Sequence, residues 1–328
     1  MPPDSASTLL RKQTLPAHIV VREVGLRDGL QSIDRIVSTS DKIQLLQSLY
    51  AAGLRHIEIG SFVPTRLLPQ MADTAKLMEA AYRLEGLETS VLVPNLRGAQ
   101  TALQTNARYL MVPLSASHAH SFANLRKTPD EVVAEVGRIR AERDSRGSTM
   151  LIDGGVGTAF GCTLQGHVAV SEVVRLTQGL LDAGADRISL ADTVGYADPA
   201  SVREVFEAVL RVAGDRLWCG HFHDTRGLGL ANVLVAMELG VHRFDTCFAG
   251  IGGCPHAPNS GGNIATDDLV FMLESMGIDT GVDVHALLEQ RKLAATILDG
   301  EVLRGAFWRA GVPITFSPPA RASAGGAL

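Results

Sequence analysis

The chain alternates short apolar runs with longer stretches of helical periodicity. Short runs rich in Val, Ile and Leu are typical of buried strands, whereas apolar residues that recur every three to four positions indicate amphipathic helices. The clearest helical stretches read TSDKIQLLQSLYAAG, TPDEVVAEVGRIRAER and SEVVRLTQGLLDAG. Eight runs predict strands, at 19–25, 56–60, 89–93, 108–113, 149–155, 186–192, 217–224 and 243–250.

The junctions between these elements indicate how they are connected. Several predicted helices begin at a Ser or Thr and end at a Gly, and three lead into a strand through AGLRHIEI, AGADRISL and LGVHRFDT. Eight strand–helix units of this kind predict an α/β fold, a (β/α)8 TIM barrel with a C-terminal helical extension. A doubly wound sheet is the alternative, but it usually carries GxGxxG after its first strand, where this chain has GLRDGLQ.

We expect one barrel domain over residues 19–312, including its C-terminal helices. Residues 1–18 lack the apolar stretch of a signal peptide, and we interpret them as a flexible leader. Residues 313–328 are rich in Pro, Ala and Gly and predict a disordered tail.

Composition excludes several classes of function. The net charge is −5 without a basic run, so we expect no nucleic-acid partner. No apolar segment reaches the roughly 18 residues that a membrane span requires, so we expect no membrane partner. The four cysteines include no CxxC pair, which predicts reduced thiols and a cytoplasmic location.

Polar residues gather where the predicted strands end, on the face where barrel enzymes form their active sites. His221 and His223 alternate along the seventh strand, so they point to the same side. With Asp28 and Asn263 they make a donor set that suits Mg²⁺ or Mn²⁺, although zinc and a pair of core histidines are alternatives. Cys219 is in phase with the histidines but one layer deeper, and we interpret it as a small core residue, like Cys247.

Three further charged residues lie at the same predicted strand ends. Arg27 adjoins Asp28 and could stabilise an oxyanion, although an ion pair that caps the strand is the alternative. Glu58 could orient this arginine or the metal site. Asp192 could accept a proton or hold a water molecule, and for both carboxylates a supporting role is equally open.

The stretch AGIGGCPHAPNSGGN places Cys254 in a loop that is too rich in glycine to form a core segment. A thiol on a movable loop near a metal site suggests a lid that closes over substrate. A structural turn with an incidental thiol is the alternative.

These motifs resemble the 3-hydroxy-3-methylglutaryl-CoA (HMG-CoA) lyase family of metal-dependent lyase and aldolase barrels. The resemblance extends from about residue 20 to about residue 289. It is carried by REVGLRDGLQ, IEIGSFVPTRLLPQMAD, VLVPNLRGAQTAL, ISLADTVG, HFHDTRGLGLANVLVAMELGV, GIGGCPHAP and GNIATDDLVFML.

The resemblance implies a carbon–carbon lyase that cleaves HMG-CoA to acetyl-CoA and acetoacetate, as in leucine catabolism. It also implies an acyl-CoA substrate and the possibility of a homodimer or larger homo-oligomer. It assigns the divalent metal to Asp28, His221, His223 and Asn263, catalysis to Arg27, Cys254, Glu58 and Asp192, and substrate binding to Gln31 and Asn124.

The chain departs from the family pattern near the expected substrate. In the loop after the eighth strand, His256 replaces a tyrosine, and residues 259–262 read NSGG where the family usually has GASG. Elsewhere, Phe122 and Ala123 replace basic residues, and Thr163 and Leu164 replace Pro and Tyr. A related substrate such as citramalyl-CoA is therefore an alternative. A retro-aldol enzyme acting on a 4-hydroxy-2-oxo acid and a catalytically silent binding barrel are two further ones.

Overall fold

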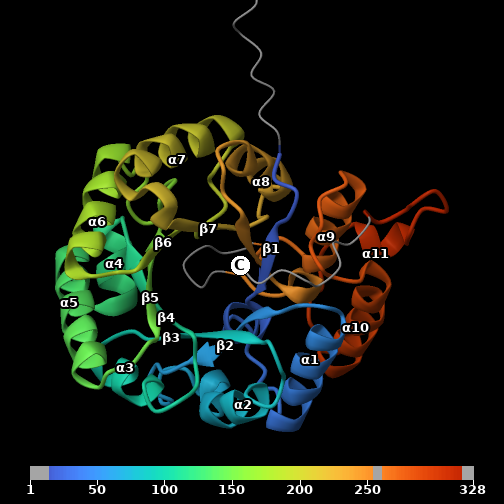
Figure 1. The fold of residues 1–328 in the computed structure, drawn as a ribbon, viewed down its shortest axis with the longest axis horizontal. Coiled ribbons are helices and arrows are strands. Elements are labelled where there is room, and N and C mark those ends of the chain that lie inside the picture. Colours follow the sequence, from blue (N-terminus) through green and yellow to red (C-terminus); the bar gives the residue numbers. More distant parts are fainter. Residues whose placement is uncertain (1–14, 254–260, 320–328) are drawn as a thin grey trace, which may run out of the picture.

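The computed structural model describes residues 15–253 and 261–319. Eight parallel strands form a closed barrel in sequence order, with β1 paired to β8, which confirms the predicted TIM barrel (Figure 1). The strands are β1 (Val20–Glu23), β2 (His56–Ser61), β3 (Glu88–Leu92), β4 (Tyr109–Ser115), β5 (Leu151–Gly157), β6 (Arg187–Asp192), β7 (Leu217–Phe222) and β8 (Arg243–Thr246).

Helices surround the barrel, and the C-terminal α10 packs beside α1 and α9 on one side (Figure 1). Buried Leu, Ile and Val side chains fill the space between the helices and the strands. The helices are α1 (Thr39–Ala51), α2 (Thr74–Ala81), α3 (Leu96–Ala102), α4 (His118–Leu125), α5 (Pro129–Ser145), α6 (Val170–Ala183), α7 (Pro199–Ala213), α8 (Gly229–Glu238), α9 (Thr266–Ser275), α10 (Val284–Ile297) and α11 (Phe307–Ala310).

The predicted helix boundaries follow from local chemistry. The Ser38 side chain accepts a hydrogen bond from a backbone N–H of the first turn of α1, and the Thr128 side chain does the same at α5. The three predicted helix-to-strand connections contain, just after the helix, a glycine with positive φ: Gly53 (107°), Gly184 (105°) and Gly240 (93°). These angles favour glycine, so the small-Gly pattern in the sequence marks real turns.

The barrel interior is charged rather than filled with the branched aliphatic layers that are usual in this fold. The Arg22 guanidinium donates to Asp245 through Nε (2.6 Å) and Nη2 (2.9 Å), and to Asp153 through Nη1 (3.0 Å). The Ser189 hydroxyl also donates to Asp153. All four side chains are buried, so the charges stabilise one another inside the barrel.

The N-terminal end of the barrel is closed by an aromatic residue between cations. The guanidinium carbons of Arg22, Arg187 and Arg243 lie 5.1, 5.2 and 4.6 Å from the ring centre of Trp218. Tyr109 packs on the same indole with ring centres 4.7 Å apart. Active sites of this fold form at the opposite, C-terminal end of the barrel.

Glu23 joins the loops that follow β1 and β8. Its Oε1 accepts hydrogen bonds from the backbone N–H of Gly25 (2.7 Å) and of Phe248 (2.9 Å), and its Oε2 accepts one from the Thr266 hydroxyl (2.5 Å). Complete burial raises the pKa of Glu23 to about 7, although these hydrogen bonds oppose the shift.

This raised pKa predicts a pH-dependent stability. Between about pH 4.5 and 7 the unfolded chain loses the Glu23 proton while the folded chain keeps it, so the free energy of unfolding falls as pH rises. Relative to Glu23→Gln, wild-type protein should lose roughly 3 kcal/mol across this range. Urea unfolding at several pH values measures the difference, with exposed Glu207→Gln as the control. A difference that does not change with pH would contradict the prediction.

Candidate active site

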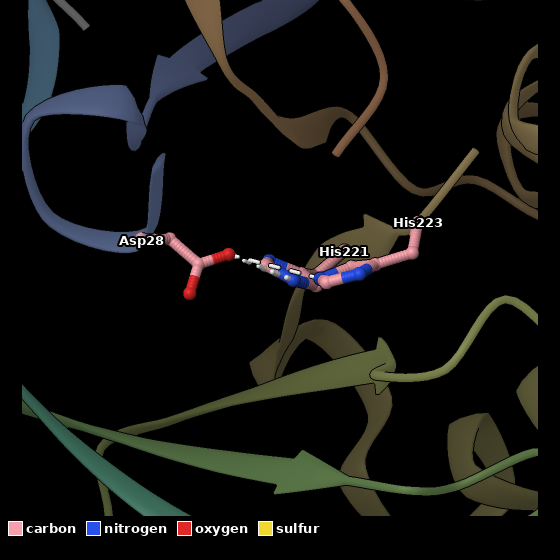
Figure 2. Close-up of side chains that lie close together, drawn as sticks. All are labelled: Asp28, His221 and His223. Carbon is pink, nitrogen blue, oxygen red and sulfur yellow. Dashed lines mark ion pairs between the residues drawn. The ribbon is translucent and has the colours of Figure 1, made fainter. Parts of the chain in front are cut away.

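Asp28, His221 and His223 converge at the C-terminal end of the barrel (Figure 2). The Nε2 atoms of both histidines lie 3.7 Å from the same oxygen, Asp28 Oδ2. Potential ligand atoms of the three residues all lie within 4.8 Å of one another. The prediction that both histidines share a face assumed that the strand includes His223, but β7 ends at Phe222. Both imidazoles nevertheless point to the same side.

Asn263 completes the predicted donor set. A backbone bridge places it opposite His223, and its Nδ2 donates to Asp28 Oδ2 (2.5 Å) and to Cys247 Sγ (3.4 Å). Its Oδ1 is buried and has no hydrogen-bond donor among the described residues. Cys247 is buried as expected, but it also fixes the Asn263 amide so that the oxygen remains free.

These residues fit a divalent cation. Two imidazole nitrogens, one carboxylate oxygen and one amide oxygen are ligands that Mg²⁺ and Mn²⁺ accept, and zinc also binds such sets. Burial alone would raise the pKa of Asp28, but the Arg27 guanidinium and the two imidazoles hold it well below its ordinary value. Asp28 is thus a carboxylate, and the unpartnered Asn263 Oδ1 is an acceptor that a cation would satisfy.

Arg27 is buried beside this group and held on two sides. Its Nε donates to Glu58 Oε2 (2.6 Å) and its Nη1 donates to Asp28 Oδ1 (2.6 Å). Its Nη2 makes no hydrogen bond within residues 15–253 and 261–319. Glu58 Oε1 is also buried without a partner in these ranges, and burial raises the pKa of Glu58.

A short π-helical turn, Gly25–Gly29, positions Arg27 and Asp28 directly after β1. A Cβ on Gly29 would lie 2.7 Å from Cγ2 of Ile251 in the loop after β8. Glycine therefore allows the two loops to approach each other and brings Asp28 close to Asn263.

Asp192 lies at the end of β6 with both oxygens occupied. Oδ1 accepts the backbone N–H of Tyr196 (2.8 Å) and Oδ2 accepts that of Ala197 (3.1 Å). Burial raises the pKa of Asp192. The geometry suits a residue that shapes the loop beside His223, whose backbone N–H lies 3.4 Å from the Asp192 carbonyl oxygen.

The other expected site residues differ in their placement. Gln31 lies beside Asp28, because its Nε2 donates to Asp28 Oδ1 (3.2 Å). Asn124 is exposed on α4, and within the described residues no hydrogen bond joins its side chain to Asp28, His221 or His223. Cys254 lies outside the described residues.

Asp245 is a further residue of the site that was not predicted from the sequence, and its Oδ2 lies 2.9 Å from Nδ1 of His221. The sequence feature that could have indicated Asp245 is an acidic residue inside a predicted strand, in the run RFDT. Alternation alone gives the face of the strand on which Asp245 lies, but not the register that places it beside His221 on the neighbouring strand β7.

Comparisons with known proteins show the family to which the chain belongs. The HMGL-like family model matches residues 18–294. The chain is 38% identical to "Hydroxymethylglutaryl-CoA lyase YngG" of Bacillus subtilis over 84% of this chain and 92% of that protein. It is 37% identical to "3-hydroxy-3-methylglutaryl-CoA lyase, cytoplasmic" of Rattus norvegicus over 87% of this chain and 83% of that protein.

A solved HMG-CoA lyase of Acinetobacter baumannii, in complex with coenzyme A and 3-methylmalate, has the same fold, with a TM-score of 0.85 and 38% identity. The match covers 93% of this chain and 98% of that one. The Pseudomonas aeruginosa hydroxymethylglutaryl-CoA lyase matches with a TM-score of 0.83 and 34% identity over 88% of this chain and 95% of that one. This chain belongs to the HMGL-like family of carbon–carbon lyases.

Proposed function

We propose that this protein is a divalent-metal-dependent lyase that cleaves HMG-CoA to acetyl-CoA and acetoacetate. The observation that carries the proposal is the convergence of Asp28, His221 and His223 beside the fixed cation of Arg27. The relatives named as HMG-CoA lyases and the related structure with coenzyme A support the choice of substrate.

The reaction is a retro-Claisen cleavage of a tertiary 3-hydroxyacyl thioester. A base takes the proton of the hydroxyl, whose oxygen becomes the carbonyl oxygen of acetoacetate. The C2–C3 bond breaks, and its electron pair forms the enolate of the acetyl thioester. An acid then protonates C2 to give acetyl-CoA. A bound divalent cation would make the hydroxyl more acidic by acting as a Lewis acid.

Arg27 would stabilise the enolate oxygen. Glu58 and Asp28 hold its Nε and Nη1, so Nη2 is the nitrogen left to donate to substrate. A donor that is already oriented needs little reorganisation when negative charge develops, and such donors contribute strongly to catalysis.

Glu58 and Asp192 differ in their ability to accept a proton. Among the described residues, Glu58 Oε1 has no hydrogen-bond donor, whereas both Asp192 oxygens already accept backbone hydrogen bonds. We therefore assign Asp192 the supporting role and keep Glu58 as the candidate base. Cys254 is proposed as the acid that protonates C2, on its sequence position alone.

Activity should depend on a divalent cation. EDTA is expected to abolish turnover, and Mg²⁺ or Mn²⁺ to restore it, because these cations prefer oxygen ligands such as those of Asp28 and Asn263. His223→Ala should lose Mn²⁺ affinity while its melting temperature stays within a few degrees of wild type. Exposed His285→Ala is the control. Full activity after removal of all metal would contradict this prediction.

Citramalyl-CoA is the second candidate substrate, because residues that depart from the family pattern are exposed on the side of the barrel where substrate is expected. Phe122 on α4 is 57% exposed and Leu164 after β5 is 50% exposed, both on the C-terminal side of the barrel. Incubation with HMG-CoA, citramalyl-CoA and a 4-hydroxy-2-oxo acid, with mass detection of products, compares the candidates. We expect the largest kcat/KM for HMG-CoA, and a larger value for either competitor would replace it as the proposed substrate.

We also propose a cytoplasmic location. The three described cysteines, Cys162, Cys219 and Cys247, are free and buried, as expected for a reducing compartment. A separate finding is that the helices of the described ranges are too short or too polar to cross a bilayer. Cell fractionation with an antibody to the full chain tests the location, and recovery of the protein in an exported fraction would contradict it.

A further inference from the structure

A buried carboxylate contacts the metal-site histidine His221 from inside the barrel. Asp245 of β8 is 1% exposed, and its Oδ2 lies 2.9 Å from His221 Nδ1. Arg22 donates to both oxygens of Asp245, through Nε (2.6 Å) and Nη2 (2.9 Å). The Cys219 thiol donates to Oδ1 at 3.2 Å.

These contacts determine which nitrogen of His221 is a donor. A carboxylate paired on both oxygens with an arginine is charged and can only accept hydrogen bonds. The Nδ1 of His221 must therefore carry the proton, and in the neutral ring Nε2 carries the lone pair. This Nε2 is the atom that faces Asp28 Oδ2 at 3.7 Å.

We propose that Asp245, held in place by Arg22, is a positioning residue that fixes the tautomer and the ring orientation of His221 for metal binding. The inference rests on the proposed metal site. Its chemical basis is general, because a metal-bound histidine is oriented by the acceptor of its other ring N–H.

The two histidines of the site differ in this respect. His223 Nδ1 is buried but has no hydrogen-bond partner among the described residues. The ring of His221 is therefore oriented by Asp245 before a metal binds. Among the described residues, nothing orients the ring of His223 through its Nδ1 in this way. Loss of Asp245 should therefore weaken metal binding through His221.

Asp153 provides a matched control. It is also buried and also accepts from Arg22, through Nη1 at 3.0 Å, but its other hydrogen bonds come from the Ser189 hydroxyl. Asp245→Asn and Asp153→Asn each remove one negative charge from the same arginine. Both should lower the melting temperature, but only Asp245→Asn can place a donor NH2 group opposite His221 Nδ1 and so favour the other tautomer.

The test is release of Mn²⁺ from the loaded full-length protein to a chelating dye, which requires no turnover. We expect Asp245→Asn to raise the Kd for Mn²⁺ about 10–100-fold, and Asp153→Asn to change it less than about threefold. Equal Kd values in the two variants would overturn the positioning role. Wild-type protein that fails to retain Mn²⁺ would instead overturn the proposed metal site.

A second measurement applies if Asp245→Asn does not fold. In ¹⁵N-histidine spectra of the Mg²⁺-loaded wild-type protein, the ring resonances absent from His221→Gln identify His221. We expect a protonated Nδ1 and an unprotonated Nε2, whereas a proton on Nε2 would overturn the proposal.

Discussion

Arg27→Lys should reduce kcat about 10²–10³-fold with little change in KM. Lysine keeps the positive charge but not the planar fork, which donates to Glu58 and Asp28 and leaves Nη2 for the proposed contact with the enolate. The lost interaction forms mainly when the enolate develops, so the ground-state complex should be little affected. Steady-state kinetics with HMG-CoA measure both constants.

Arg35→Lys is the matched control, because Arg35 is exposed and donates to the backbone oxygen of Ile297. We expect this variant to retain wild-type kcat and KM. If Arg27→Lys raises KM and leaves kcat unchanged, Arg27 contributes to ground-state binding rather than to enolate stabilisation.

Cys254→Ala and Cys254→Ser should lose most of their turnover and retain Mn²⁺ binding and melting temperature. A hydroxyl is a far weaker acid than a thiol, so serine cannot deliver the proton to C2 at a comparable rate. Glycine and proline surround Cys254 in the sequence, which predicts that its side chain adds little to the core, so we expect unchanged stability. Stopped assays, Mn²⁺ titration and thermal melts measure these three properties.

The other cysteines give this prediction a direct chemical control. Cys162, Cys219 and Cys247 are buried, and burial raises the thiol pKa of Cys219 and Cys247 well above the ordinary value. Iodoacetamide should therefore label Cys254 first in the folded protein, and a substrate analogue should slow the labelling. Near-normal kcat in Cys254→Ala would favour the retro-aldol alternative, which needs no thiol.

Much of the fold follows from the sequence because the two periodicities alternate eight times. Strand parity also predicts that His221 and His223 share a face, and barrel geometry brings the end of β1 to the same mouth. The observed convergence of Asp28 with both histidines follows from these two rules.

The remaining features depend on contacts between distant positions. Arg22 and Asp245 are separated by 223 positions, and no local pattern indicates that they pair. Strands β1 and β8 also end earlier than predicted, at Glu23 and Thr246, because compact turns follow them. These turns are stabilised by Glu23, whose role becomes visible only when the loops after β1 and β8 lie together.

The most direct test of the proposed activity is cleavage of HMG-CoA in D₂O with Mg²⁺ and the full-length protein. The mechanism predicts equal amounts of acetoacetate and acetyl-CoA, with one solvent deuterium in the acetyl methyl group, because the enolate carbon is protonated by an exchangeable acid. Mass spectrometry of both products measures stoichiometry and label together. Unchanged HMG-CoA, or release of free CoA without acetyl-CoA, would contradict the account.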